Sequence, residues 1–215
     1  MRRTRPLSRT FWPEVTESPA ASIMESSWDV DMTTFSEAEV TSCIRRLKTN
    51  RAAGPDELAP ILFKEAGKAL IPRLTELFRL IWDSEEIPED WGESVVVPIF
   101  KKGNRQLCDN YRGISLTPVI SRVFASLLLK RLSVAQDSRI REEQAGFRQG
   151  RGCIDHIFTL RQILEFRHAY HQPTIAVFLD FTGAFDSVDR AALFRTLLNR
   201  GVPKKCVNFI RSIYR

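Results

Sequence analysis

The sequence predicts an α+β fold, because stretches with helical spacing of apolar residues alternate with short runs rich in β-branched residues. Helical spacing is clearest between Ser36 and Leu47 and between Leu70 and Trp82. Residues 94–100 (SVVVPIF) and 174–181 (TIAVFLDF) are instead short, apolar and rich in β-branched or aromatic residues. That composition favours strands, so both kinds of element are expected.

The composition is that of a globular protein with enough chain to bury a core. Of the 215 residues, 43% are apolar and 27% are charged. No apolar run approaches the roughly 20 residues that a membrane-spanning helix needs, so no membrane partner is predicted. The four cysteines, Cys43, Cys108, Cys153 and Cys206, lie far apart in the sequence, which indicates neither a zinc site nor a disulfide framework.

The charge is distributed unevenly along the chain. Residues 1–100 contain 12 Lys or Arg and 17 Asp or Glu, a net charge of −5, whereas residues 101–215 contain 20 and 9, a net charge of +11. A basic segment attracts a polyanion because each neutralised phosphate releases counterions. A solvated basic surface is the alternative, and charge alone does not decide between them.

The first part of the chain predicts helices after a polar lead-in. Residues 1–34 are rich in Ser, Thr, Pro and Glu and lack periodicity, which predicts little structure. Ser36 and Glu39 have capping-box spacing, so a helix is expected to start there. Gly54 in the loop NRAAGPDEL ends it, and Pro60 opens a further helical signal that continues to Trp82.

The remainder predicts a hairpin, three helices and a buried strand. The elements expected are strands at 94–100 and 111–116 joined by a polar loop, helices at about 118–134 and 153–170, a strand at 174–181, and a helix containing Leu193, Leu197 and Leu198 that Gly201 terminates. The unbroken apolar run of residues 174–181 is typical of a strand covered on both faces.

Asp180 is the most informative candidate residue. It ends an otherwise apolar predicted strand, where an ionised carboxylate loses hydration unless a cation or a hydrogen-bond donor compensates it. A divalent metal ion is one such compensation, and capping of the following turn is the other. Asp189 is a candidate N-cap for the last helix, and Asp186 carries a weaker signal.

Four segments together resemble the reverse transcriptases of non-long-terminal-repeat retrotransposons, in the order and spacing of that family. They are NRAAGPDEL at 50–58, VVVPIFKKGN with NYRGISL at 95–116, QAGFRQGRGCIDHI at 144–157, and FLDFTGAFDSV at 178–188. The resemblance runs from about Phe35 to Arg215. The last segment is similar to the first palm motif of the family. The second and third are similar to its fingers hairpin and its fingers motif, and NRAAGPDEL is similar to the segment ahead of the fingers.

The resemblance implies a right-hand polymerase fold and RNA-templated DNA synthesis. After the lead-in of 1–34, the reverse transcriptase domain would span 35–215, with fingers at about 35–172 and the start of the palm at about 173–215. The implied partners are an RNA template, a DNA primer and deoxynucleotide triphosphates. The implied cofactor is Mg²⁺, as two ions, and the implied location is the nucleus or the cytoplasm.

By the same resemblance, the palm motif provides metal and sugar contacts. Asp180 would bind the metal ions together with the main-chain carbonyl of Phe181. Phe185 would stand beneath the incoming sugar, where a flat ring blocks a 2′-hydroxyl. An ordinary core aromatic is the alternative for Phe185.

The fingers motifs provide basic contacts in the family. Lys101 or Lys102 and Arg112 would hold the triphosphate, and strand alternation leaves open which lysine faces the nucleotide. The alternative for the lysines is a solvated loop. Arg148 and Arg151 would contact the template backbone from a glycine-rich loop.

The paired-aspartate motif of the family, an aromatic residue followed by Ala, Asp and Asp, does not occur in this sequence. The chain is therefore expected to be a truncated part that lacks the C-terminal palm and thumb and is inactive alone. A non-catalytic nucleic-acid-binding remnant of a decayed retroelement is the alternative function, and a structural protein with an incidental basic half is a third.

Overall fold

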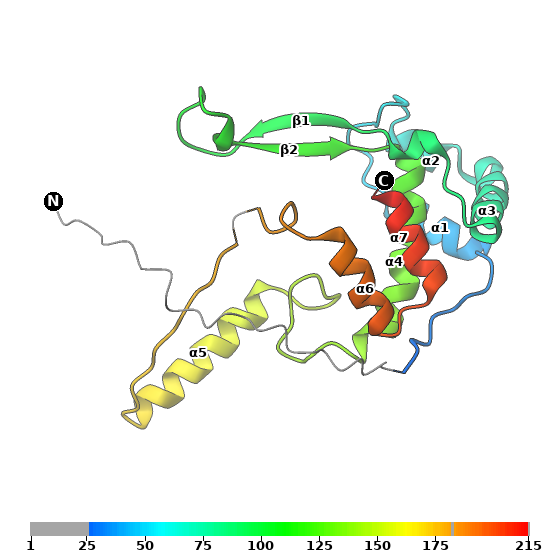
Figure 1. The fold of residues 1–215 in the computed structure, drawn as a ribbon. Helices are drawn as coiled ribbons and strands as arrows, with labels where there is room; N and C mark the ends of the chain where they lie inside the picture. The colour runs from blue at the N-terminus through cyan, green and yellow to red at the C-terminus, as the bar shows by residue number, and fades with distance from the viewer. Residues whose placement is uncertain (1–25, 182, 215) are drawn as a thin grey trace.

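The computed structural model describes residues 26–181 and 183–214, and it contains helices and one antiparallel hairpin (Figure 1). In chain order the elements are α1 (Glu37–Arg46), α2 (Pro60–Glu65), α3 (Gly67–Ser84), the short 3-10 helix η2 (Glu89–Gly92), β1 (Val95–Phe100), the 3-10 turn η3 (Cys108–Asn110), β2 (Tyr111–Leu116), α4 (Val119–Asp137), α5 (Cys153–Ala169), α6 (Arg190–Asn199) and α7 (Lys204–Ile213). This mixture of helix and strand agrees with the predicted α+β class. No described helix is long and apolar enough to cross a membrane.

The capping box at the start of α1 is present as predicted. The backbone N–H of Glu39 donates to the Ser36 hydroxyl at 3.3 Å, and the backbone N–H of Ser36 donates to the Glu39 carboxylate at 2.9 Å. These two bonds satisfy donors that the first helical turn leaves free, an arrangement that stabilises a helix by about 1 kcal/mol.

The helical signal from Pro60 to Trp82 is divided between two helices. Pro60 is the first residue of α2, as predicted, but α2 ends after Glu65. Gly67, the first residue of α3, has a φ of +41°, which lies outside the helical region and separates α2 from α3. The apolar spacing continues across this break, so periodicity alone does not reveal it.

The core is built from aromatic rings of α3, α4 and α7 around Phe35. The Trp82 ring lies 5.0 Å from Phe35 edge-on and stacks on Phe209 at 5.3 Å, and Phe209 meets Phe124 at 5.3 Å. All four side chains are at most 1% exposed. Such pairs add stabilisation beyond their buried area, so they join α7 to the N-terminal helices.

Residues 26–34 contain no helix or strand, yet part of this segment is packed. The Trp28 indole N–H donates to the carbonyl of Arg200 at 2.6 Å, and the Trp28 backbone N–H donates to the carbonyl of Gly201 at 2.9 Å. Val30 is buried in the core. The packed part of the chain therefore includes residues that the sequence assigned to the lead-in, while residues 1–25 lie outside the described residues.

The loop that resembles the segment ahead of the fingers packs on the start of α4. A Cβ atom at Gly54 would lie 2.5 Å from the backbone nitrogen of Pro118, so this close approach requires glycine. The Arg122 guanidinium donates to the carbonyl of Ala52 at 3.1 Å.

The predicted hairpin is present. β1 and β2 pair antiparallel, with Val95 opposite Leu116 and Phe100 opposite Tyr111. The Lys101 N–H donates to the carbonyl of Asn110 at 2.8 Å and extends the pairing toward the turn. The hairpin projects from the helical part of the molecule (Figure 1).

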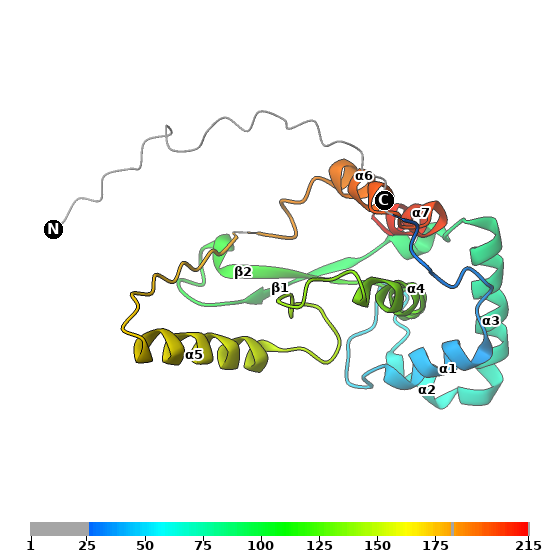
Figure 2. The same ribbon diagram turned by 90° about the horizontal axis from the view of Figure 1, so that it is seen from below.

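The predicted buried strand at 174–181 is wrong. The segment has no strand assignment, and its apolar side chains are exposed, for example Ile175 at 93% and Leu179 at 83%. A strand covered on both faces needs neighbouring strands to hydrogen-bond with it, and β1 and β2 are the only paired strands within the described residues. The segment instead connects α5, which lies apart from the helical core, to α6 (Figures 1 and 2).

Candidate active site

Asp180 lies in the extended segment that precedes a turn at residues 183–187 and the start of α6. Its side chain is exposed, and no described residue donates a hydrogen bond to its carboxylate. The turn is closed by the Ser187 N–H, which donates to the carbonyl of Gly183 at 2.9 Å. Asp189 caps α6, because its carboxylate accepts a hydrogen bond from the Ala192 N–H at 3.0 Å, as predicted.

The described residues do not assemble a complete metal site around Asp180. No group of three or more His, Cys, Asp or Glu side chains within them is placed to hold an ion. Asp180 and the Phe181 carbonyl supply oxygen donors of the kind that Mg²⁺ prefers, but Mg²⁺ takes near-octahedral coordination and two such donors leave most positions to other groups. The donor set therefore fits one part of a metal site and not a whole one.

Phe185 contacts an aromatic residue of the glycine-rich loop. Its ring meets the Phe147 ring edge-on, with the centroids 5.8 Å apart and the planes at 87°. Phe185 is 77% exposed and Phe147 is 96% exposed, so neither is a core aromatic within the described structure. The contact joins the loop that resembles a template-binding motif to the segment that carries Asp180.

The backbone and the neighbouring arginine orient Phe147. Phe147 has a φ of +59°, a left-handed conformation that is unusual for an aromatic residue. The Arg148 guanidinium forms an ion pair with Asp137 at 2.8 Å and donates to the carbonyl of Arg141 at 3.2 Å. These bonds attach the loop to the end of α4. Strained residues of this kind cluster at functional sites, and sequence analysis did not single out Phe147.

The two arginines of this loop differ in their surroundings. The Arg148 side chain is mostly covered and has the partners just described, whereas Arg151 is exposed. No ion pair within the described residues involves Arg151. Of the two predicted template contacts, Arg151 is the one whose guanidinium is available.

The three predicted nucleotide-binding residues of the hairpin lie together near its turn. Lys101 and Lys102 follow the end of β1 and are exposed. Arg112 lies on β2, opposite Ile99 of β1. The structure leaves both lysines accessible and does not distinguish between them.

Sequence comparisons with known proteins identify the family of this chain. A sequence model of the reverse transcriptase (RNA-dependent DNA polymerase) family matches residues 99–215, from the end of β1 to the end of the chain. The chain is 31% identical over 199 residues to the putative 115 kDa protein in the type-1 retrotransposable element R1DM of Drosophila melanogaster, a match that covers 92% of this chain and 19% of that protein.

Two further Drosophila melanogaster relatives come from other elements. The chain is 27% identical over 213 residues to the retrovirus-related Pol polyprotein from the type-2 retrotransposable element R2DM, covering 95% of this chain and 19% of that protein. It is 29% identical over 163 residues to the probable RNA-directed DNA polymerase from transposon X-element, a match that covers 74% of this chain and 18% of that protein.

The match spans more than half of the chain, and the chain belongs to the reverse transcriptase (RNA-dependent DNA polymerase) family. Its relatives are proteins of non-long-terminal-repeat retrotransposable elements, which confirms the family that the four sequence motifs predicted. The chain spans about a fifth of the length of these relatives.

Proposed function

We propose that this chain supplies the fingers and the first palm motif for RNA-templated DNA synthesis, arranged as part of a right-hand polymerase. The observation that carries the proposal is the family match over residues 99–215, which includes the basic hairpin, the glycine-rich loop and the Asp180 segment. The substrates are an RNA template, a DNA primer and deoxynucleotide triphosphates, and the cofactor is Mg²⁺.

Each part has a separate role in this proposal. Lys101 or Lys102 and Arg112 bind the triphosphate, because ammonium and guanidinium groups match phosphate oxygens. Arg151 binds the template backbone. Phe185 excludes the 2′-hydroxyl of a ribonucleotide from the space beneath the sugar.

Asp180, with the Phe181 carbonyl, contributes to binding of the divalent ions. When bound, such ions stabilise the charge that develops on the attacking and leaving oxygens. Since the described residues offer only part of the ligand set, the 215-residue chain alone is expected not to incorporate deoxynucleotides. A non-catalytic nucleic-acid-binding remnant of a retroelement is the alternative function.

Primer extension on an RNA template with Mg²⁺ or Mn²⁺ tests the proposal. We compare the 215-residue chain with a chain continued through a paired-aspartate motif, each with and without Asp180→Asn, and with Asp186→Asn as the matched control. Synthesis is expected only in the continued chain, to be abolished by Asp180→Asn and retained in Asp186→Asn. No synthesis in the continued chain would favour the remnant, and synthesis unaffected by Asp180→Asn would overturn the assignment of Asp180.

A further inference from the structure

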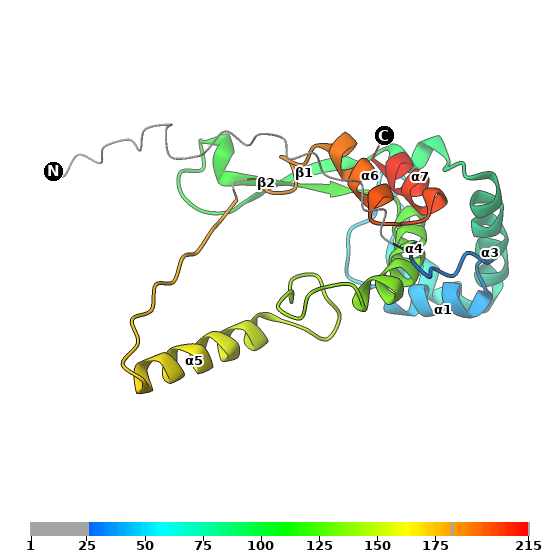
Figure 3. The same ribbon diagram turned by 60° about the horizontal axis from the view of Figure 1, so that its bottom comes forward.

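The last two helices form a strongly basic part of the chain that the proposed polymerase site does not use. Residues 190–215 contain seven basic residues and no Asp or Glu; the seven are Arg190, Arg195, Arg200, Lys204, Lys205, Arg211 and Arg215. Helices α6 and α7 contact each other, and they lie on the side of α4 opposite α1 (Figures 2 and 3). This part of the protein therefore attracts anions.

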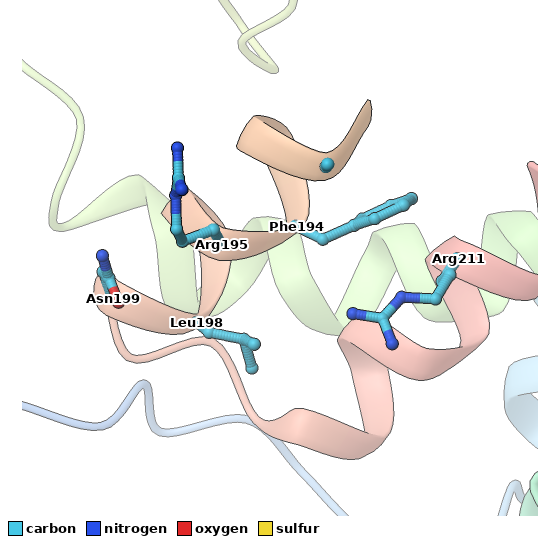
Figure 4. Close-up of a pocket in the computed structure, with 6 residues that line it drawn as sticks. Phe194, Arg195, Leu198, Asn199 and Arg211 are labelled. Carbon is cyan, nitrogen blue, oxygen red and sulfur yellow. The ribbon is translucent and has the colours of Figure 1, made fainter. Parts of the chain in front are cut away.

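A hollow of about 460 Å³ lies between α6 and α7. Its lining residues are Ala191, Phe194, Arg195, Leu198 and Asn199 from α6 and Arg211 from α7. Figure 4 shows Arg195 and Asn199 on one side and Arg211 on the other, with Phe194 and Leu198 between them. The hollow thus combines an apolar floor with a cationic group at each side, and its volume falls within the range of small-ligand pockets.

The arginine on α7 is held in place by an aromatic ring. The Arg211 guanidinium carbon lies 5.2 Å from the centre of the Phe194 ring. No carboxylate of the described residues forms an ion pair with Arg195 or Arg211. A positioned guanidinium with its charge free is suited to bind a phosphate oxygen.

We propose that this hollow binds single-stranded nucleic acid. Arg195 and Arg211 bind backbone phosphates, and an unpaired base lies on the floor of Leu198 and the Arg211–Phe194 stack. An apolar floor can accept a base face only where the base is not stacked inside a duplex, which selects a single strand. The absence of any acidic residue between 190 and 215 favours a polyphosphate strand, and the flat aromatic–guanidinium stack favours a base over an acidic peptide.

The test measures how the binding of an oligonucleotide to the 215-residue chain depends on salt concentration. Fluorescence anisotropy detects the binding, with a short oligouridylate and the matched oligothymidylate as ligands. Each phosphate contact on a single strand contributes a slope of about 0.7 in log affinity against log salt. The double variant Arg195→Gln, Arg211→Gln should therefore lower the slope by about 1.4. The loss of these two contacts should also weaken binding by the double variant about 25-fold at about 0.1 M salt.

The matched control is Arg45→Gln, Arg46→Gln, which removes the same charge from the exposed end of α1, across α4 from the hollow. We expect it to leave the slope within about 0.3 of the original protein. Arg195→Gln alone, at an exposed position with no ion pair among the described residues, covers the case in which the double variant unfolds. It should lower the slope by about 0.7.

Three outcomes would overturn the proposal. The first is an unchanged salt slope in the folded variants, and the second is an equal fall of the slope in the α1 control. The third is competition by polyglutamate as strong as competition by oligouridylate, and this third outcome would assign the hollow to an acidic protein partner. An abasic strand should bind more weakly than the intact one, because only a base occupies the floor. Equal losses with RNA and DNA indicate a site for either strand, and a loss with RNA alone restricts it to RNA. The assay contains no nucleotide substrate, so a failure of primer extension does not affect its outcome.

Discussion

Replacement of Arg131 by Met is expected to destabilise the fold strongly. The Arg131 side chain is 4% exposed and extends from α4 into the core. Its Nε and Nη2 atoms donate to the two Glu39 carboxylate oxygens at 2.9 Å each, and its Nη1 donates to the carbonyls of Asp31 and Thr33. Its guanidinium carbon lies 4.3 Å from the centre of the Phe35 ring. One side chain therefore connects α4, α1 and the segment before α1.

The expected loss follows from the groups that the substitution leaves without partners. Breaking a buried ion pair by removing one partner costs about 3 to 5 kcal/mol. The Glu39 side chain is 23% exposed and regains some water, which lowers that figure, and the carbonyls of Asp31 and Thr33 each lose a partly buried hydrogen bond at about 1 kcal/mol. Met retains the apolar stem, so packing changes little. We expect the free energy of unfolding to fall by about 3 to 5 kcal/mol.

Urea unfolding followed by tryptophan fluorescence measures this loss, because the buried Trp82 ring lies 5.5 Å from the Arg131 guanidinium carbon. The control is Arg161→Met on α5, where the ion pair with Glu165 is exposed and the unfolding midpoint should not move. A loss below about 1 kcal/mol with an unchanged m-value would refute the reasoning, since it would mean that the apolar core stabilises α1 and α4 without this network.

Three further outcomes follow from the same structure. Burial raises the pKa of Glu39, but hydrogen bonds from Arg131 and Ser36 outweigh it and lower the pKa. The ionised form of Glu39 therefore stabilises the fold above the ordinary glutamate pKa, and this stabilisation is lost as the pH falls through the lowered pKa. In Glu39→Gln the free energy of unfolding should consequently fall less steeply at acid pH. In RNA-binding titrations, Arg151→Gln should lower the salt slope by about 0.7 while Arg148→Gln leaves it unchanged; an equal fall in both would contradict the assignment of Arg148 to loop anchoring. In primer extension by a chain continued through the paired-aspartate motif, Phe185→Val should let ribonucleotides compete better, and unchanged discrimination in an active enzyme would exclude the sugar contact.

Local signals in the sequence predicted local structure. The capping box at Ser36, the antiparallel hairpin and the cap at Asp189 are all present, because capping and strand alternation depend on residues a few positions apart. The family resemblance was equally local, since each motif is a short word with a fixed order along the chain. These features needed no knowledge of the tertiary structure.

Features that depend on distant partners were not predictable in the same way. The apolar run at 174–181 has a strand composition, but strand formation requires a neighbour, and the described residues provide none. The contacts of Trp28 with the turn between α6 and α7 join residues 172 positions apart, and the polar composition of residues 1–34 gave no indication of them. Helix α7 was also not predicted, although its Cys206, Val207 and Phe209 side chains are buried.

The candidate site shows the same division between residue type and placement. The sequence motifs identified Phe185 and Arg148 as functional candidates, but not the residue between them in space. Phe147 reaches Phe185 because its own backbone is left-handed and because Arg148 is bonded to the end of α4. A glycine-rich loop can adopt many conformations, so its sequence does not specify which side chain it presents. The ion pair of Arg148 with Asp137 restricts the loop, and the Phe147 ring of this loop lies against Phe185, the residue proposed to select the sugar. We therefore expect a substitution at Arg148 to loosen the contact between Phe147 and Phe185 as well as the loop itself.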